Sequence, residues 1–125
     1  MQYQPSAAEL LAAIAELLED DLLPAVPDAL KHRTRVAANL ARILEREEAL
    51  GPDAARRERE RLAALVGGGG GADGDDAVRL ALELARRVRA DDDPGFQADA
   101  WEALVAICRD DLAIAKPGHD AWEGQ

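Results

Sequence analysis

The sequence predicts an all-α protein, built as one bundle of four to five amphipathic helices. Hydrophobic residues make up 48% of the 125 residues but aromatic residues only 3%, so Ala, Leu, Val and Ile must supply the core. Ala and Leu are strong helix formers, while the residues that fill strands are scarce. Apolar residues recur at helical spacing and nowhere alternate as a strand requires. The length suits one helical domain, which we expect over residues 1–117.

The first helix is predicted over residues 7–23. Ser6 and Glu9 have the spacing of a capping box, in which each side chain accepts a hydrogen bond from the other residue's amide. Leucines and an isoleucine then recur every three or four residues as far as Pro24. Proline lacks an N–H and its ring clashes with the preceding turn, so it should end this helix.

Asp28 is a suitable N-cap for a second helix over residues 28–50, and Gly51-Pro52 is typical of a helix end. A third helix follows over residues 53–66. Its mixed-sign run from Arg56 to Arg61 is typical of a solvated face.

Glycines dominate residues 67–74, which predicts a flexible loop because consecutive glycines lose much backbone entropy when ordered. This loop lacks the pattern of a phosphate-binding loop, since a helix precedes it and Asp75 and Asp76 follow it. The fourth helix is predicted over residues 75–90, with its apolar stripe at Val78, Ala81, Leu82, Ala85 and Val88.

The last helix is predicted over residues 96–115 and a loose tail over residues 118–125. Its apolar stripe takes in Trp101, Leu104, Val105, Cys108 and Leu112 at helical spacing, and Pro117 follows. On this pattern Cys108 is expected to behave as a small core residue rather than as a reactive thiol.

Composition and charge exclude several function classes. The net charge of -10 argues against nucleic acid and anionic membranes, which bind surplus Lys and Arg. One cysteine allows neither an internal disulfide nor a multi-thiolate zinc site, and the N-terminus resembles neither a signal peptide nor a membrane span. We therefore expect a cytoplasmic protein without cofactor or metal.

Polar residues interrupt the apolar arc of the second helix. Val36, Leu40, Ile43, Leu44 and Leu50 share that arc, with Glu47 near its centre and Arg35, Asn39 and Arg46 along one border. On the last helix, Asp111 lies between the directions of Leu104 and Ile107. We expect Glu47 to be enclosed by apolar neighbours, and a buried carboxylate requires a basic partner or a raised pKa.

Two interpretations of these five polar residues stay open. Arg35, Asn39, Arg46, Glu47 and Asp111 either form an internal network that fixes helix register or line a polar pocket for a small molecule. The sequence has no nucleophile elbow, zinc pattern or di-iron motif, so no catalytic residue is predicted.

Three segments carry a resemblance to a known family: Pro5 to Leu11, Arg35 to Asn39 with Arg46-Glu47, and Leu112 to Pro117. In these segments the chain resembles an uncharacterised family of small bacterial all-helical domains. Members are found fused to, or encoded beside, aminoglycoside-phosphotransferase-like kinases, often near acyl-CoA dehydrogenases. The resemblance brings no catalytic residue and implies an accessory or partner of such an enzyme.

Together these observations favour a non-enzymatic helical domain that binds a protein partner or itself. The alternative is a small-molecule binder or weak enzyme built on the polar group. An excess of apolar side chains beyond what the helices can bury would favour the interaction domain.

Overall fold

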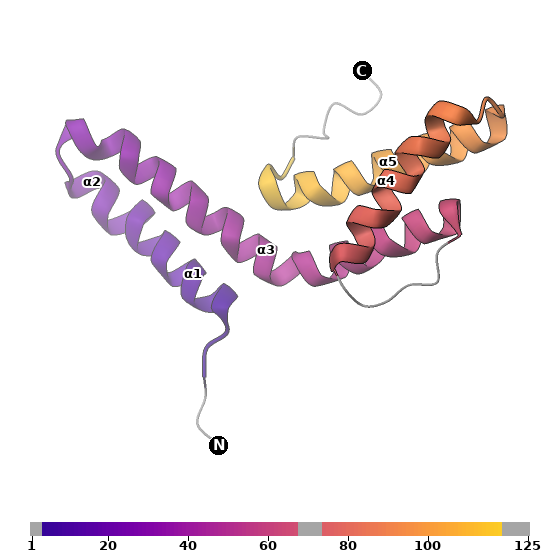
Figure 1. Ribbon diagram of the computed structural model, residues 1–125. Helices are drawn as coiled ribbons and strands as arrows, with labels where there is room; N and C mark the ends of the chain where they lie inside the picture. Colours follow the sequence, from indigo (N-terminus) through magenta and orange to yellow (C-terminus); the bar gives the residue numbers. More distant parts are fainter. Residues whose placement is uncertain (1–3, 68–73, 119–125) are drawn as a thin grey trace. The chain divides into compact units, whose positions relative to one another are not determined.

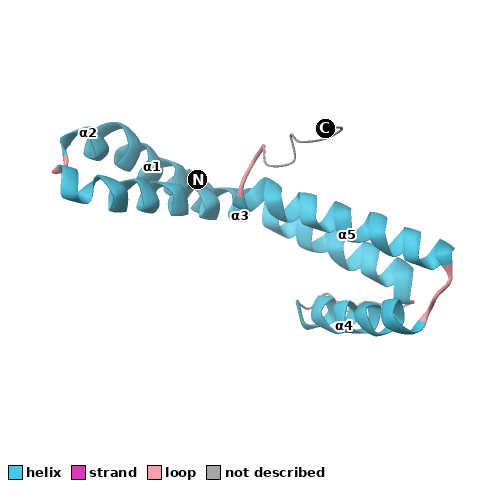
Figure 2. Cartoon of the chain, turned by 90° about the horizontal axis from the view of Figure 1, so that it is seen from above, coloured by secondary structure: helices cyan, strands magenta, loops and turns pink. Residues whose placement is uncertain are grey.

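The computed structural model describes residues 4–67 and 74–118, and within these ranges it contains helices and no strand (Figures 1 and 2). The all-α prediction is therefore confirmed. The helices are α1 (Ala7–Glu16), its π-helical continuation η1 (Leu17–Leu22), α2 (Leu23–Ala25), α3 (Asp28–Val66), α4 (Gly74–Ala90) and α5 (Pro94–Ala115). Most of the predicted glycine loop and of the predicted tail lies outside the described residues.

Capping side chains begin the first helix as predicted. Ser6 Oγ accepts from the Glu9 amide at 3.1 Å, and Glu9 Oε2 accepts from the Ser6 amide at 2.7 Å, so the capping box is confirmed. The helix runs on through η1 and α2 to Ala25, two residues beyond the prediction. Pro24 lies in this continuous stretch one residue before its end, so the cost of its missing N–H falls in the last turn.

The predicted break at Gly51-Pro52 is wrong, because α3 is one helix of 39 residues with Pro52 inside it. An internal proline removes one hydrogen bond and crowds the carbonyl four residues earlier. Good helix formers, mainly Ala, Leu, Arg and Glu, occupy both sides of this position and outweigh that cost. A helix-ending sequence signal thus lies within a continuous helix.

The end of α3 and the start of α5 follow ordinary capping rules. Gly67 ends α3 with a φ of 70°, a conformation that a residue with a side chain rarely adopts, and its amide donates to the Ala63 carbonyl at 2.8 Å. Asp93 Oδ2 accepts from the Phe96 amide at 3.0 Å at the start of α5. Pro94 occupies the first turn of that helix, so α5 begins two residues earlier than predicted.

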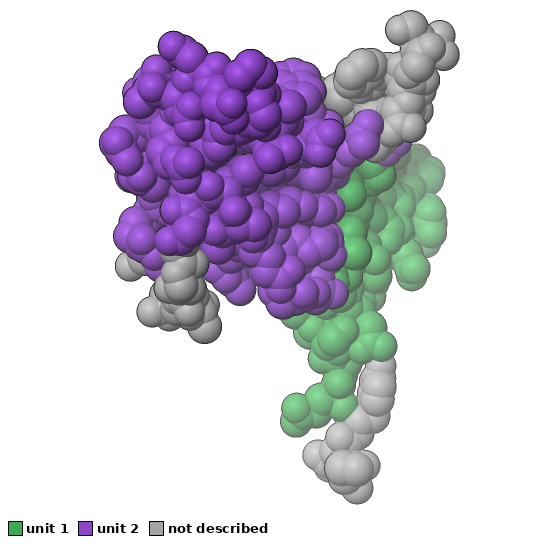
Figure 3. Space-filling view, turned by 90° about the vertical axis from the view of Figure 1, so that its right-hand side faces the viewer, with its two compact units in different colours: residues 1–52, 113–117 green, residues 53–112, 118–125 purple. Residues whose placement is uncertain are grey.

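The described helices form two compact units (Figure 3). The N-terminal unit comprises Met1–Pro52 with Ala113–Pro117, and the C-terminal unit comprises Asp53–Leu112 with Gly118–Gln125. Helix α3 contributes to both units, and so does α5. Each unit is described below on its own.

The N-terminal unit is an antiparallel pair of helices, which we call the N-terminal hairpin (residues 7–50). The stretch α1–η1–α2 turns at Val26-Pro27 and lies beside the first half of α3 (Figure 1, indigo to purple). Its buried residues are three alanines, Ala15, Ala38 and Ala41. Small side chains let the two helix backbones approach closely, so Leu11 and Leu18 beside Ala15 are only half-buried and Leu10 and Ile14 are exposed.

The C-terminal unit has a larger core. Leu62 of α3, Leu80 and Leu84 of α4 and Ala100 of α5 are buried together, and Phe96 packs against them. The partly buried residues Ala63, Leu65, Val66, Val88 and Ile107 complete the cluster. This core joins three helices, as a bundle requires.

The predicted apolar stripes of α4 and α5 form this core only in part: Val88 packs against it, but other members of the stripes are exposed. Val78 and Leu82 of α4 are more than 60% exposed, and Trp101 of α5 is 70% exposed. Cys108 is also exposed, so the prediction that it is a core residue is wrong. Each helix carries two neighbouring apolar stripes, and helical periodicity alone does not decide which one is buried.

Replacing Gly51 should stabilise α3. An added Cβ would have Glu47 Cγ as its nearest neighbour at 3.6 Å, an ordinary contact, so Gly51→Ala fits the helix. Alanine loses less backbone entropy than glycine, and we expect a gain of about 0.5–1 kcal/mol in the free energy of unfolding, measured by urea denaturation. The matched control Ala49→Gly, at an exposed position of the same helix, should lose a similar amount. A destabilised Gly51→Ala variant would show that the helix needs glycine here.

Enlarging the hairpin contact should destabilise it. Ala15 has 0% exposure against α3, so Ala15→Leu inserts three carbons where there is no room. Overpacking of this kind costs about 1–3 kcal/mol, which thermal and urea denaturation can measure. Ala13→Leu, two residues away at an exposed position, serves as the control and should stay within about 0.5 kcal/mol of wild type. Equal effects of the two substitutions would contradict the alanine contact.

Candidate protein-interaction surface

The five polar residues singled out by the sequence do not form one buried group. Arg35, Asn39 and Glu47 of α3 are exposed, Asp111 of α5 is exposed, and Arg46 is half-buried. The prediction that apolar neighbours enclose Glu47 is wrong, and among the described residues it has no ion pair with an arginine. The physical reason is that the apolar arc around Glu47 is itself exposed.

Arg46 has a structural contact. Its Nε donates to the Ile114 carbonyl at 2.6 Å, within the N-terminal unit. The last four carbonyls of an α-helix have no intrahelical partner, and Ile114 lies in the last turn of α5. Arg46 therefore holds the end of α5 against the middle of α3.

An arginine and two carboxylates do bridge the hairpin, but they are not the predicted ones. Arg42 donates to both carboxylate oxygens of Glu19, at 3.1 and 3.0 Å, and to Glu45 at 2.9 Å. The hydrogen bonds from Arg42 lower the pKa of Glu19, and burial opposes them only in part. The same contacts, with Glu19 first, raise the pKa of Arg42. Glu19 lies in η1, whose wider turn a helical count of 3.6 residues does not follow.

A second ion-pair group lies in the C-terminal unit at the residue next to Asp111. Asp110 Oδ2 accepts from Arg57 Nε at 3.1 Å and from Arg61 Nη1 at 2.7 Å. The hydrogen bond from Arg57, followed by that from Arg61, lowers the pKa of Asp110. Arg57 and Arg61 belong to the run that we expected to be a solvated face, yet they bind α5, whereas Arg56 pairs within its own helix as expected.

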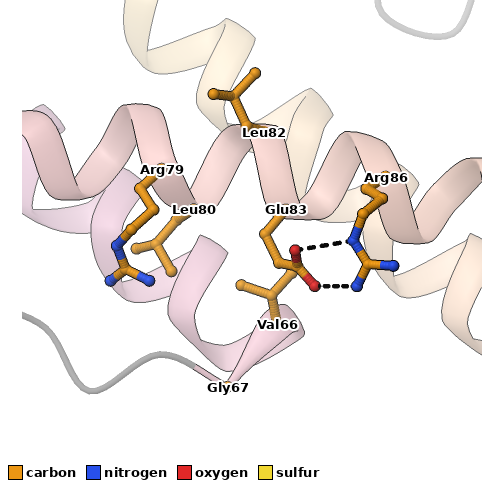
Figure 4. Close-up of a pocket in the computed structure, with 7 residues that line it drawn as sticks. All are labelled: Val66, Gly67, Arg79, Leu80, Leu82, Glu83 and Arg86. Carbon is orange, nitrogen blue, oxygen red and sulfur yellow. Dashed lines mark hydrogen bonds and ion pairs between the residues drawn. The ribbon is translucent and has the colours of Figure 1, made fainter.

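A hollow of about 520 Å³ lies in the C-terminal unit, and Arg79 and Arg86 are among the residues that line it (Figure 4). Arg86 is paired with Glu83, and Arg79 donates to Asp76 at 2.8 Å. Both partners lie three residues before their arginine on α4, so each cation is already neutralised. The hollow therefore offers an anionic ligand no unpaired arginine.

The described residues also lack two other kinds of site. No group of three or more His, Cys, Asp or Glu side chains in that part of the chain could hold a metal ion. None of the described helices is both long enough and apolar enough to cross a bilayer.

Exposed apolar side chains are the most prominent surface feature of the N-terminal hairpin. Of the thirteen large hydrophobic residues that are exposed in the described chain, nine belong to this hairpin. They are Leu10, Ile14, Leu17 and Leu22 on the first helical stretch and Leu30, Val36, Leu40, Leu44 and Leu50 on α3. Contiguous apolar surface of this kind marks interaction sites in soluble proteins.

The central members of this set lie on one face of the hairpin. Leu10 and Ile14 are displaced from the buried Ala15 by roughly a third of a turn, and Leu40 is displaced from Ala38 and Ala41 by a similar angle in the same rotational sense. Two antiparallel helices with equal displacements present those residues on the same side. We call Leu10, Ile14, Val36, Leu40 and Leu44 the apolar face.

The opposite side of the hairpin is polar. Four polar residues are rotated away from the buried alanines in the other sense: Glu9 and Glu16 of α1, and Arg35 and Asn39 of α3. All four side chains are exposed. Glu47 lies within about 20° of Leu40 around α3, on the side of the apolar face, whereas Asn39 and Arg35 lie about 80° and 120° away from Glu47. The hairpin as a whole is therefore amphipathic.

Comparison with known proteins gives a family match without a function. A family model described as "Domain of unknown function (DUF6285)" matches residues 24–119, about three quarters of the chain. The match includes two of the three segments on which the sequence resemblance rests, and Pro5 to Leu11 precedes it. No curated protein and no solved structure matches the chain.

Asp110 should make stability depend on pH. Because its pKa is lowered in the folded state, its stabilising effect is complete above the ordinary carboxyl value of about 4 and is lost as the pH falls through the folded-state value. At pH 7 we expect Asp110→Asn to lower the free energy of unfolding by about 1 kcal/mol. Urea denaturation over a pH series should show this difference shrink below about pH 4.

Asp111 provides the matched control for that experiment, because it is adjacent and exposed. Asp111→Asn should remain within about 0.5 kcal/mol of wild type at every pH. An Asp110→Asn deficit that persisted undiminished in acid would contradict the ion-pair assignment.

Proposed function

We propose that this chain, which belongs to the DUF6285 family of domains of unknown function, is a non-catalytic helical accessory domain that binds protein through the apolar face of its N-terminal hairpin. One observation carries the proposal: the hairpin buries three alanines and leaves nine large hydrophobic side chains exposed. The excess of apolar side chains that favours an interaction domain is thus present.

Energetics support a partner on this face. Full burial of one leucine, isoleucine or valine side chain contributes roughly 1.5–3 kcal/mol. The five residues of the apolar face are between 44% and 54% exposed, so a covering partner gains a substantial part of that contribution at each of them. A small number of such central side chains supplies most of the affinity in typical interfaces.

The titratable groups give no support to an enzymatic alternative. General acid–base catalysis near neutral pH uses carboxyl groups whose pKa is raised by burial or by like charges. Glu19, Glu83 and Asp110 instead have a lowered pKa, in each case because an arginine donates to the carboxylate. These carboxylates serve as ion-pair partners.

The class of partner is suggested by the family resemblance alone. We propose that the domain is an accessory of an aminoglycoside-phosphotransferase-like kinase or of an acyl-CoA dehydrogenase, because the resemblance associates such domains with these enzymes.

The small-molecule alternative has weaker support. A polar pocket built on Arg35, Asn39, Arg46, Glu47 and Asp111 requires these side chains to converge. Glu47 shares the side of the apolar face, and Arg46 is engaged with the Ile114 carbonyl. We therefore favour protein binding over a ligand pocket at these residues.

A pull-down from native lysate tests the proposed function. We expect the wild-type chain to retain a phosphotransferase-like enzyme, a dehydrogenase or further copies of itself, each identified by mass spectrometry. Leu40→Glu places a charge at the centre of the apolar face and should reduce capture by roughly tenfold or more.

Leu82→Glu is the matched control, because Leu82 is also an exposed leucine but belongs to α4 of the C-terminal unit. Its capture should equal that of wild type. Capture that both substitutions left unchanged would show that the apolar face is not the docking surface.

A further inference from the structure

We propose that the partner seated on the apolar face is a second copy of this chain, with the two α3 helices antiparallel and crossing at Leu40. This inference rests on the proposed function and names the occupant of the same surface. It follows from the distribution of charge and of apolar residues about Leu40.

Arg33, Leu40 and Glu47 lie in one line along α3. They are spaced by seven residues, so two helical turns, about 10.5 Å, separate Leu40 from each charged residue, and all three point in nearly the same direction. A cation and an anion therefore stand at equal distances on either side of an exposed leucine.

A symmetric antiparallel pair would join these charges. A two-fold axis through Leu40 places Arg33 of one copy opposite Glu47 of the other, and it does so twice. Both side chains are exposed, and within the described chain neither takes part in an ion pair. The arrangement explains why a carboxylate interrupts an apolar stripe: it meets a guanidinium of the second copy.

Apolar residues are matched by the same axis. Positions equally distant from Leu40 in the sequence come together, and on this side of α3 they are apolar in both directions. The matched pairs are Val36 with Leu44, Ala37 with Ile43, and Leu30 with Leu50. Leu40 meets Leu40 of the second copy at the axis.

Parallel pairing is disfavoured by the same charges. It would set Glu47 against Glu47 and Arg33 against Arg33, and like charges opposed in an interface suppress association. The charge pattern thus specifies both a second copy and its direction.

The surface is large enough for a stable dimer. Leu30 to Leu50 spans about 30 Å of helix, and two adjacent helices are about 20 Å wide. Two such faces together bury on the order of 1,200 Å², the lower end of the range for stable interfaces. Four helices would then enclose the leucines, as in a four-helix bundle.

Charge reversal tests the register, with molar mass measured by sedimentation velocity on the full chain. Wild type should be dimeric. Arg33→Glu and Glu47→Arg should each weaken the dimer roughly tenfold or more, because each creates two like-charge contacts. The double variant R33E/E47R should restore it. An equimolar mixture of the two single variants should form a heterodimer, since one copy then carries both anions and the other both cations.

Restoration of the dimer in the double variant, or in the mixture of single variants, requires contact between residues 33 and 47 of different copies. Residues 33 and 47 are about 21 Å apart along one helix, too far for an ion pair within the chain. Arg35→Glu, an equal charge change on the polar side of the hairpin, is the matched control and should leave the dimer intact. Circular dichroism verifies that each exposed substitution preserves the helices.

A monomeric wild type, or a dimer indifferent to both single reversals, would overturn the inference. If a monomeric chain nevertheless captured one of the two enzymes in a Leu40-dependent manner, the proposed function would stand with a different occupant. A monomer that captured neither enzyme would overturn both proposals.

Discussion

Alanine contacts between helices determine where the larger side chains of this protein lie. In the hairpin, the buried residues Ala15, Ala38 and Ala41 are small and let the two backbones approach closely. Close approach leaves no space into which leucines a third of a turn away could reach. Helix α5 shows the same pattern of a buried alanine beside an exposed large side chain, since Ala100 is buried in the core while Trp101 is exposed. Apolar residues that would fill a core in a wider bundle therefore form surface stripes.

Arginines compensate for the small apolar contacts. Arg42 clamps Glu19 and Glu45 in the hairpin, and Arg57 with Arg61 clamps Asp110 in the C-terminal unit. Arg87 donates to the Leu65 carbonyl at 2.8 Å near the end of α3, and its guanidinium lies 4.6 Å from the Phe96 ring centre. These bonds are directional, so they fix the register of helices whose alanine contacts would tolerate sliding.

Much of the fold could be predicted from local chemistry, but which face of each helix is packed could not. The Ser6 capping box and the Gly67 helix end depend on a few neighbouring residues, and both are confirmed. Pro52 is a strong local signal that the surrounding helix formers override. Periodicity located the apolar stripe around Leu40 correctly, but it does not say whether a partner helix covers that stripe. The burial of Glu47 was wrong for this reason, and the ion-pair group that Arg42 forms with Glu19 and Glu45 includes none of the five polar residues singled out by the sequence.

The energetic effect of Glu47 in its apolar stripe depends on whether a second surface covers it. In water the carboxylate is solvated, and its position on the stripe has almost no energetic consequence. Once a second surface excludes that water, the charge loses several kcal/mol of solvation unless a cation replaces it. Leucines would stabilise many registers of two sliding helices almost equally, but only registers that bring a guanidinium to Glu47 avoid this loss. Since Arg33 is the cation on the same line of α3, the apolar residues supply the energy of association and the two charges restrict it to one geometry.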